Sequence, residues 1–436
     1  MNERLALSRM LSELRKGMGR FPDGRTGKNI VYPMAAVGMA AFSVFFMQNP
    51  SFLAYQQAMK ESKGRNNAES LFGLQTIPSD NEIRSLLDGV RPEELCGMYR
   101  WVLEELDRGG ILKGMRSYGN QLLIALDGTW YFRSKKIQCV NCNTQELTDG
   151  SRLYYHSLIT PVIVAPGKAQ VIALEPEFIL PQDGHEKQDC EMAAAKRWIS
   201  QHGPRYAGKG VTILGDDLYS KQPFCQLLKN EHFHFILVCK GDSHPQMTET
   251  LDFLAKDGVL AFCSKRHWNG KQAEISTYRF ANQVPLRAGP DAISVNWCEI
   301  RVTAENTGEL LYHNSFVTNF ELSEATVEAV VRDGRARWKV ENENNNVLKN
   351  KGYHLEHNFG HGDHFLSSLL LSLNLLAFLF HTVLDLVDER YLKIRQELAS
   401  RKTFFHDLDA LTRYLIFDTW DQLFDFMFHN LELDTS

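Results

Sequence analysis

A single stretch, residues 121–130, restricts the fold of this chain more than any other feature. It contains five mainly branched apolar residues that run directly into Asp127, and Gly128 then allows the chain to turn. A short apolar run that stops at a polar residue is typical of a buried central strand. The stretch therefore predicts a strand at 121–126 that carries the Asp127 carboxylate at its end.

Two further acids extend this pattern. Residues 211–215 are an apolar run that ends at Asp216, and Glu341 lies much later in a stretch of helical rather than strand character. Two strand-end aspartates and one helix-borne glutamate supply the oxygen ligands of a two-metal phosphoryl-transfer site. Such a site holds two hard cations about 3.5–4 Å apart on rigid elements.

The order of these acids carries a resemblance to a known family. Asp127, Asp216 and Glu341 resemble the acidic set of the DDE transposases of bacterial insertion sequences, and Arg337 stands four residues before the glutamate. The best match is the cut-and-paste group, whose RNase-H-like domain carries a β-rich insertion between the second Asp and the Glu. The resemblance covers roughly residues 116–385.

The helix that carries the glutamate fits the signature of that group in part. The signature is Tyr-x2-Arg-x3-Glu-x6-Lys, and Arg337 and Glu341 occupy its Arg and Glu positions. Gly334 stands at the Tyr position, and Lys349 lies one residue beyond the Lys position. The resemblance implies that Arg337, Trp338 and Lys349 contact DNA.

The resemblance also implies that Asp127, Asp216 and Glu341 bind two Mg²⁺ or Mn²⁺ ions. Carboxylates that share one site repel one another, and divalent cations offset that repulsion. Oxygen ligands select Mg²⁺ or Mn²⁺ over Zn²⁺. Asp217 and Glu343 are neighbouring alternatives, but the family pattern Gly-Asp-x-Leu-Tyr favours Asp216, and the Arg-Trp-x2-Glu spacing favours Glu341.

The chain of 436 residues is long for one hydrophobic core, which favours two or three units. Patterning and the resemblance together predict an N-terminal helical, DNA-binding domain at 1–115, an α/β RNase-H-like catalytic domain at 116–240 and 321–385, and a C-terminal helical segment at 386–436. Expected strands of the catalytic sheet are 121–126, 152–160, 169–175, 211–215 and 233–239, and expected helices are 190–200 and 221–229.

Residues 241–320 break the alternation of strands and helices. Short β-like runs there sit between turn-rich stretches without helical periodicity, and the segment lies where the family has its β-rich insertion. We expect a separate β-rich unit that does not continue the catalytic sheet. Its Trp268 and Trp297 suit either stacking on distorted DNA ends or packing in a core.

Composition restricts the partners of the protein. The net charge of −5 argues against a uniformly basic DNA coat, so a DNA-binding surface must be local. Residues 1–30 hold seven Lys or Arg against three Asp or Glu, which suits either DNA contact or a solvated helix face. Two apolar runs, 30–47 and 365–384, contain proline or several polar residues, so we expect buried helices there and no membrane span.

A second kind of metal site is the less favoured of two interpretations of the cysteines and histidines. The eight cysteines are mostly isolated, which indicates a reducing compartment. Cys139 and Cys142 have the spacing of zinc ligands and His156 lies downstream, although the pair lacks a second CxxC half. The spacing of the histidine-rich stretch 354–364 suits a metal or phosphate site, but surface or core histidines are the favoured interpretation.

These features predict a transposase that cuts DNA at the ends of a mobile element and joins those ends to target DNA. We expect a homodimer on DNA, associated with the nucleoid in the cytoplasm of a prokaryote. One alternative is an RNase-H-like nuclease that cleaves without joining. Another is a non-catalytic DNA-binding relative of transposases, which the complete set of three acids argues against.

Overall fold

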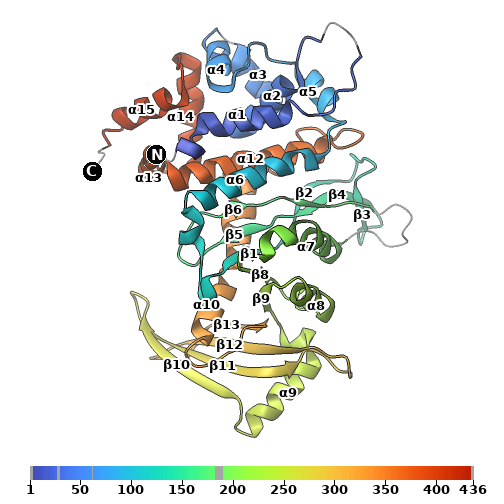
Figure 1. The fold of residues 1–436 in the computed structure, drawn as a ribbon, viewed down its shortest axis with the longest axis vertical. Coiled ribbons are helices and arrows are strands. Elements are labelled where there is room, and N and C mark those ends of the chain that lie inside the picture. The colour runs from blue at the N-terminus through green and yellow to red at the C-terminus, as the bar shows by residue number, and fades with distance from the viewer. Residues whose placement is uncertain (1–2, 27–29, 61, 182–189, 434–436) are drawn as a thin grey trace.

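A large mixed β-sheet extends from the middle of the molecule to its lower end in Figure 1, and helices from both ends of the chain gather at the opposite end. The structure is a computed structural model that describes residues 3–26, 30–60, 62–181 and 190–433. The α-helices in these residues are α1 (Leu7–Met18), α2 (Met34–Phe46), α3 (Phe52–Lys60), α4 (Ser62–Phe72), α5 (Asp80–Leu87), α6 (Cys96–Arg108), α7 (Glu191–Ala207), α8 (Gln222–Asn230), α9 (Pro245–Lys256), α10 (Val327–Arg335), α11 (Asn346–Asn350), α12 (Leu366–Val387), α13 (Glu389–Glu397), α14 (Arg401–Tyr414) and α15 (Trp420–Asn430).

The strands, short 3₁₀ turns and one π-helix complete the described secondary structure. The strands are β1 (Leu122–Ala125), β2 (Gly128–Ser134), β3 (Asn143–Glu146), β4 (Arg152–Ile159), β5 (Val162–Val164), β6 (Ile172–Ala173), β7 (Glu177–Ile179), β8 (Val211–Gly215), β9 (His234–Val238), β10 (Ala261–Trp268), β11 (Ala273–Pro285), β12 (Ser294–Ala304) and β13 (Leu310–Thr318). The 3₁₀ turns are η1 (Glu3–Leu5), η2 (Pro92–Leu95), η3 (Ile111–Met115), η4 (Tyr118–Asn120) and η5 (Gly241–Ser243), and the π-helix is η6 (Val340–Asn345).

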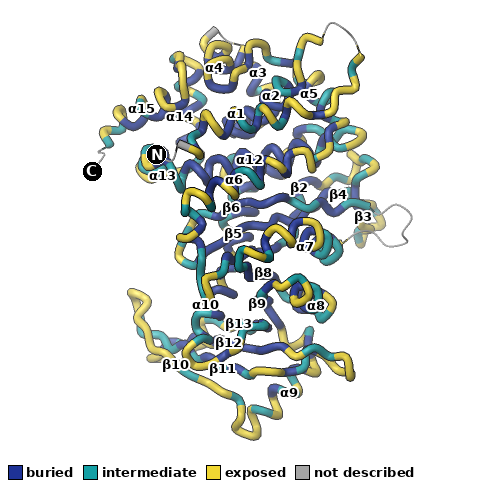
Figure 2. Tube along the Cα trace, in the orientation of Figure 1, coloured by how far each residue is buried: buried dark blue, intermediate teal, exposed yellow. Residues whose placement is uncertain are grey.

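Nine strands of the described chain form the large sheet, in the order β10-β11-β12-β13-β9-β8-β1-β5-β6. β1 is parallel to β8 and β8 is parallel to β9, whereas β5 and β6 join as antiparallel neighbours. Every residue of β1, β5 and β8 is buried, which explains why these strands are almost continuous apolar runs. Figure 2 shows this centre of the sheet in dark blue. The strands predicted at 121–126, 211–215 and 233–239 are confirmed as neighbours.

A second, four-stranded sheet contains β2, β4 and β3, with β7 paired to β4. The strand expected at 152–160 forms β4, but it lies in this second sheet, and β5 takes the place beside β1. Pro161 separates the two strands, because proline has no N–H to continue a ladder. The strand expected at 169–175 is reduced to β6.

The helices expected at 190–200 and 221–229 are confirmed as α7 and α8. α7 packs on β4 and β7 of the second sheet, and Trp198 Nε1 donates to the Glu175 carbonyl oxygen at 2.9 Å. α8 lies against β9 of the large sheet. α7 therefore brings its first residue, Glu191, close to the start of β2, where Gly128 N donates to the Glu191 carboxylate.

The prediction that residues 241–320 form a separate unit is wrong. Residues 316–318 of β13 pair antiparallel with residues 236–238 of β9, and β12, β11 and β10 continue the same sheet (Figure 1). Without β13, β9 would be an edge strand with unpaired backbone groups, and β13 satisfies them. The segment also contains an unexpected helix, α9. Trp297 is buried in this extension, whereas Trp268 is exposed.

Helices from the two ends of the chain share one core. Asn67 Nδ2 donates to the carbonyl oxygens of Thr412 (2.6 Å) and Leu415 (2.7 Å), and Trp420 Nε1 donates to the Leu71 carbonyl at 2.9 Å. The N-terminal domain predicted at 1–115 and the C-terminal segment predicted at 386–436 pack against each other and bury apolar side chains in one core.

α12 is the central helix of this packing. Its length and composition would allow it to cross a membrane, but 83% of its most apolar 18-residue window is buried inside the protein. It contacts α2 in the helical part and β6 in the large sheet. The buried helices expected at 30–47 and 365–384 are confirmed as α2 and α12.

Candidate active site

The two strand-end aspartates lie at the same edge of the large sheet. β1 and β8 are parallel with Ala125 opposite Leu214, and Leu126 N donates to the Leu214 carbonyl oxygen at 2.9 Å. Asp127 lies two residues after Ala125, and Asp216 lies two residues after Leu214. The register of the two strands therefore places the two acids side by side. The expected placement of both acids at neighbouring strand ends is confirmed.

Arg337 and Glu341 lie on the segment that follows α10. Arg337 Nη1 lies 2.6 Å from Glu341 Oε1. Glu341 belongs to the π-helix η6, a wide turn that occurs frequently at functional sites. The Glu341 side chain is 49% exposed and the Arg337 side chain only 17%, so the acid faces solvent while the guanidinium supports it from the protein side.

Asn345 connects the π-helix to the first aspartate. Its Nδ2 donates to Asp127 Oδ2 at 2.8 Å. Its Oδ1 accepts from Thr160 Oγ1 at 2.9 Å and from Asn344 Nδ2 at 3.0 Å, which determines which end of the amide faces Asp127. The segment that carries Glu341 is therefore held directly against the end of β1.

Four acids act on one another at this position. Burial raises the pKa of Asp127 to about 7, and the nearby negative charges of Glu191, Glu341 and Asp216 contribute to this rise. The Arg337 guanidinium opposes it. The Asp127 carboxyl therefore lies within range of the charges of the other two acids predicted from the sequence and of Arg337.

Glu191 is a site residue that the sequence did not reveal. Its Oε1 accepts hydrogen bonds from Tyr219 Oη at 2.7 Å and from Gly128 N at 3.2 Å. Burial raises its pKa, and the charge of Asp216 adds to the rise. Glu191 lies in no recognisable sequence motif. It comes to lie beside Asp127 only when α7 packs on the second sheet. Its position at the start of a predicted helix was the one available signal.

Lys349 lies on the wall of a cleft beside the acids. The cleft has a volume of about 470 Å³, and its lining includes Gly128, Trp130, Arg133 and Glu191 as well as Lys349. Lys349 Nζ lies 3.3 Å from Glu356 Oε1 across this wall. The predicted DNA contact at Lys349 is thus adjacent to the acidic site.

Trp338 lies in a second cleft, of about 860 Å³, on the other flank of the same segment. Its side chain is 44% exposed, and Lys339 Nζ lies 4.9 Å from the centre of its ring. Basic side chains gather along this cleft: Lys168, Lys265, Arg266, Arg332, Arg335 and Lys339. Two acids, Glu328 and Glu343, also line this cleft, so it carries a local excess of positive charge.

The two neighbouring acids have other roles. Asp217 accepts hydrogen bonds from Lys240 N at 2.6 Å and from Ser243 Oγ, so its carboxylate supports the loop that leads to α9. Glu343 lines the basic cleft with Trp338. Asp216 and Glu341 are the acids of the predicted set whose charges act on Asp127, so they stay the candidates for this site.

The chemistry of the acidic site fits hard cations. Asp127, Asp216, Glu191 and Glu341 offer carboxylate oxygens, and a buried ionised carboxylate such as Asp127 is costly without a neutralising partner. Among the described residues, these acids do not form a group of three with mutually close ligand atoms. A group of cysteines and histidines elsewhere does so.

The chain matches no model of a known protein family, and no curated protein matches it either.

Glu191→Gln tests the role of the fourth acid. The glutamine oxygen retains both hydrogen bonds that reach Glu191 Oε1, while the negative charge beside Asp127 is removed. The pKa of Asp127 should fall, and the pH at which a metal-dependent activity rises should move downward with it. We expect a loss of about tenfold at most at high pH. A pH–rate profile measures both effects, and a loss as large as that of an Asp127 variant would instead make Glu191 a metal ligand.

Proposed function

We propose that this protein is a DDE transposase, which cleaves DNA at the ends of a mobile element and transfers those ends to target DNA with Mg²⁺ or Mn²⁺. One observation carries the proposal. Asp127 and Asp216 follow neighbouring parallel strands in register, and the Arg337–Glu341 segment is tied to Asp127 through Asn345. Such a set of acids on rigid elements suits two-metal phosphoryl transfer.

The order of elements supports the proposal at the level of fold. Three strands of the large sheet (β1, β5 and β6) are followed by α7, β8, α8 and β9. When the strands of the second sheet (β2, β3, β4 and β7) are left aside, this succession resembles that of an RNase-H-like domain: three strands, a helix, and alternating strands and helices. The β-rich segment 241–320 falls between Asp216 and Glu341, as in the cut-and-paste group, even though it extends the sheet.

Asp127, Asp216 and Glu341 would hold the metal ions, which supply activation of the attacking water or 3′-hydroxyl and stabilisation of the leaving oxygen. Asn345 orients the Asp127 carboxylate by donating to Oδ2. Arg337, held against Glu341, offers its guanidinium to a phosphate near the scissile bond.

DNA binding has a local surface available. The basic cleft beside Trp338 and the cleft beside Lys349 flank the segment that carries Glu341. Basic side chains bind the phosphate backbone, and the half-exposed Trp338 ring can stack on an unpaired base. Under this proposal the protein acts as a homodimer on DNA in the prokaryotic cytoplasm.

The decisive experiment uses the DNA that flanks the reading frame. Labelled duplexes made from these flanks, incubated with the protein and Mg²⁺, should be nicked at a defined position and then joined to a second duplex. Nicking without joining would favour the RNase-H-like nuclease instead. Binding without either reaction, in Mg²⁺ and in Mn²⁺, would leave the non-catalytic DNA-binding relative and overturn the proposal.

Arg337→Ala should weaken binding of the element ends and reduce the salt dependence of binding by about one phosphate contact. Arg413→Ala is a matched control, because Arg413 also pairs with an acid one helical turn away, Asp409, but in α14 of the helical part. Binding isotherms at several salt concentrations give both slopes. Equal slopes for Arg337→Ala and the unaltered protein would make Arg337 a structural partner of Glu341 only.

A further inference from the structure

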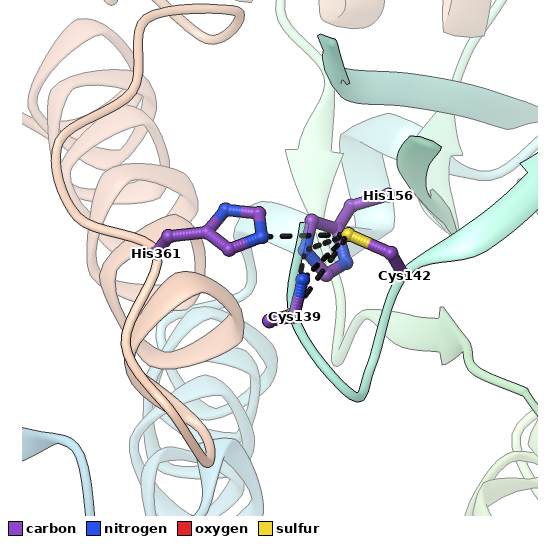
Figure 3. Close-up of side chains that lie close together, drawn as sticks. All are labelled: Cys139, Cys142, His156 and His361. Carbon is purple, nitrogen blue, oxygen red and sulfur yellow. Dashed lines mark hydrogen bonds between the residues drawn. The ribbon is translucent and has the colours of Figure 1, made fainter. Parts of the chain in front are cut away.

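We propose that four side chains of this chain bind one structural zinc ion: Cys139, Cys142, His156 and His361 (Figure 3). The cysteines lie in the turn between β2 and β3, and His156 lies in β4. His361 comes from the segment between α11 and α12, far away in the sequence. The site is separate from the acidic site and does not depend on the proposed function.

The distances within this group match a tetrahedral zinc site. The two sulfurs lie 3.9 Å apart, and His156 Nε2 lies 3.5 Å from each of them. His361 Nε2 lies 3.4 Å from Cys142 Sγ. Tetrahedral zinc with Zn–S of about 2.3 Å and Zn–N of about 2.0–2.1 Å places its sulfurs about 3.8 Å apart and sulfur and nitrogen about 3.5 Å apart.

The ligand set selects zinc and closes its coordination sphere. Two thiolates and two imidazoles are a Cys₂His₂ set, which suits zinc rather than Mg²⁺ or Ca²⁺. Both rings direct Nε2 toward the sulfurs (Figure 3). Cys142 is 6% exposed and His156 is 1% exposed, so the centre of the group is shielded from solvent. Four protein ligands leave no position for a substrate, which is typical of a structural site.

A disulfide does not explain the group. A disulfide requires an S–S distance of about 2.0 Å, whereas the Cys139 and Cys142 sulfurs are 3.9 Å apart. Cys139 N donates to Cys142 Sγ at 3.4 Å, a contact that favours a thiolate at this position. A disulfide would also leave unexplained why His156 and His361 both lie beside the two sulfurs.

The zinc ion would fasten the segment before α12 to the second sheet. Asn141 Nδ2 donates to the His364 carbonyl oxygen beside the site, so the two segments already meet there. Glu356, which lies in the same segment as His361, pairs with Lys349 in the cleft near the acids. Zinc would join the second sheet, through Cys139, Cys142 and His156, to the segment before α12, through His361. It would therefore stabilise the wall of the cleft that Glu356 forms.

Metal analysis tests the proposal without DNA. The full chain, purified without a histidine tag and in the presence of a reducing agent, should contain about one zinc ion per molecule by elemental analysis. Cys142→Ser and His361→Ala should each lower this content at least several-fold. Two matched controls should keep it: Cys190→Ser, since Cys190 is an exposed cysteine outside the group, and His364→Ala, since the His364 side chain is exposed.

Cobalt provides a readout on the unaltered protein, which does not depend on whether a variant folds. Metal-free protein titrated with Co²⁺ should develop the visible absorption bands of tetrahedral cobalt with thiolate ligands, and Zn²⁺ should abolish them. Absence of these bands, together with zinc content no higher than that of Cys142→Ser, would overturn the proposal. Asp127→Asn should retain zinc fully, so failure of the zinc site and failure of the proposed DNA cleavage are distinguishable.

Discussion

Asp127→Asn, Asp216→Asn and Glu341→Gln should each reduce Mg²⁺-dependent DNA cleavage about a thousandfold or more, while the protein stays folded and binds DNA. The reason is that metal ligands act as a unit, so the loss of one disables the site almost as fully as the loss of all. These exchanges keep the shape of each side chain and remove only the charge. Single-turnover cleavage of a labelled element end measures the effect.

Asp217→Asn is the matched control for these variants. Asp217 is adjacent to Asp216, but its carboxylate faces Lys240 N and Ser243 Oγ, and an amide can keep both contacts. Its cleavage rate should therefore remain near that of the unaltered protein. If Asp127→Asn or Asp216→Asn cleaved at a similar rate, the assignment of the acidic site would be wrong.

The stability of the protein without added divalent metal should fall as the pH rises from about 4 to about 7. The pKa of Asp127 is raised from 3.8 to about 7 by burial and by the neighbouring acids, so the folded state holds this proton more tightly than the unfolded state. The stabilisation is fully present below the unfolded pKa and is lost as the pH passes through the folded pKa. The full difference corresponds to about 4 kcal/mol at most.

Asp127→Asn should remove most of this loss, because an amide carries no charge at any of these pH values. Urea unfolding at pH 5 and pH 8, for this variant and the unaltered protein, gives the comparison through the free energies of unfolding. Added Mg²⁺ should restore stability at pH 8 in the unaltered protein and not in the variant. The same pH dependence in both proteins would show that Asp127 is not the group that titrates, and Asp217→Asn should leave that dependence in place.

Local patterns were sufficient for the elements that carry the acids. The buried strands before Asp127 and Asp216 are apolar runs that end at a polar residue, and such a run by itself predicts a buried strand. Arg337 and Glu341 stand four residues apart, and residues at that spacing on a helix are neighbours, which explains their contact. The spacing of Cys139 and Cys142 likewise indicated a pair of metal ligands.

Contacts between distant parts of the chain could not be predicted in this way. Glu191 reaches Asp127 only because α7 packs on the second sheet, and His361 reaches Cys142 only because the segment before α12 folds back over β4. β13 joins β9 because that strand offers an unpaired edge, which no pattern within 241–320 records. Periodicity in a sequence describes the environment of each element, whereas the partner of an element depends on which buried surfaces and unpaired backbone groups remain to be covered. The strands that carry Asp127 and Asp216 could thus be predicted from the sequence, while the place of Glu191, the approach of His361 to the cysteines and the extent of the sheet were decided by packing.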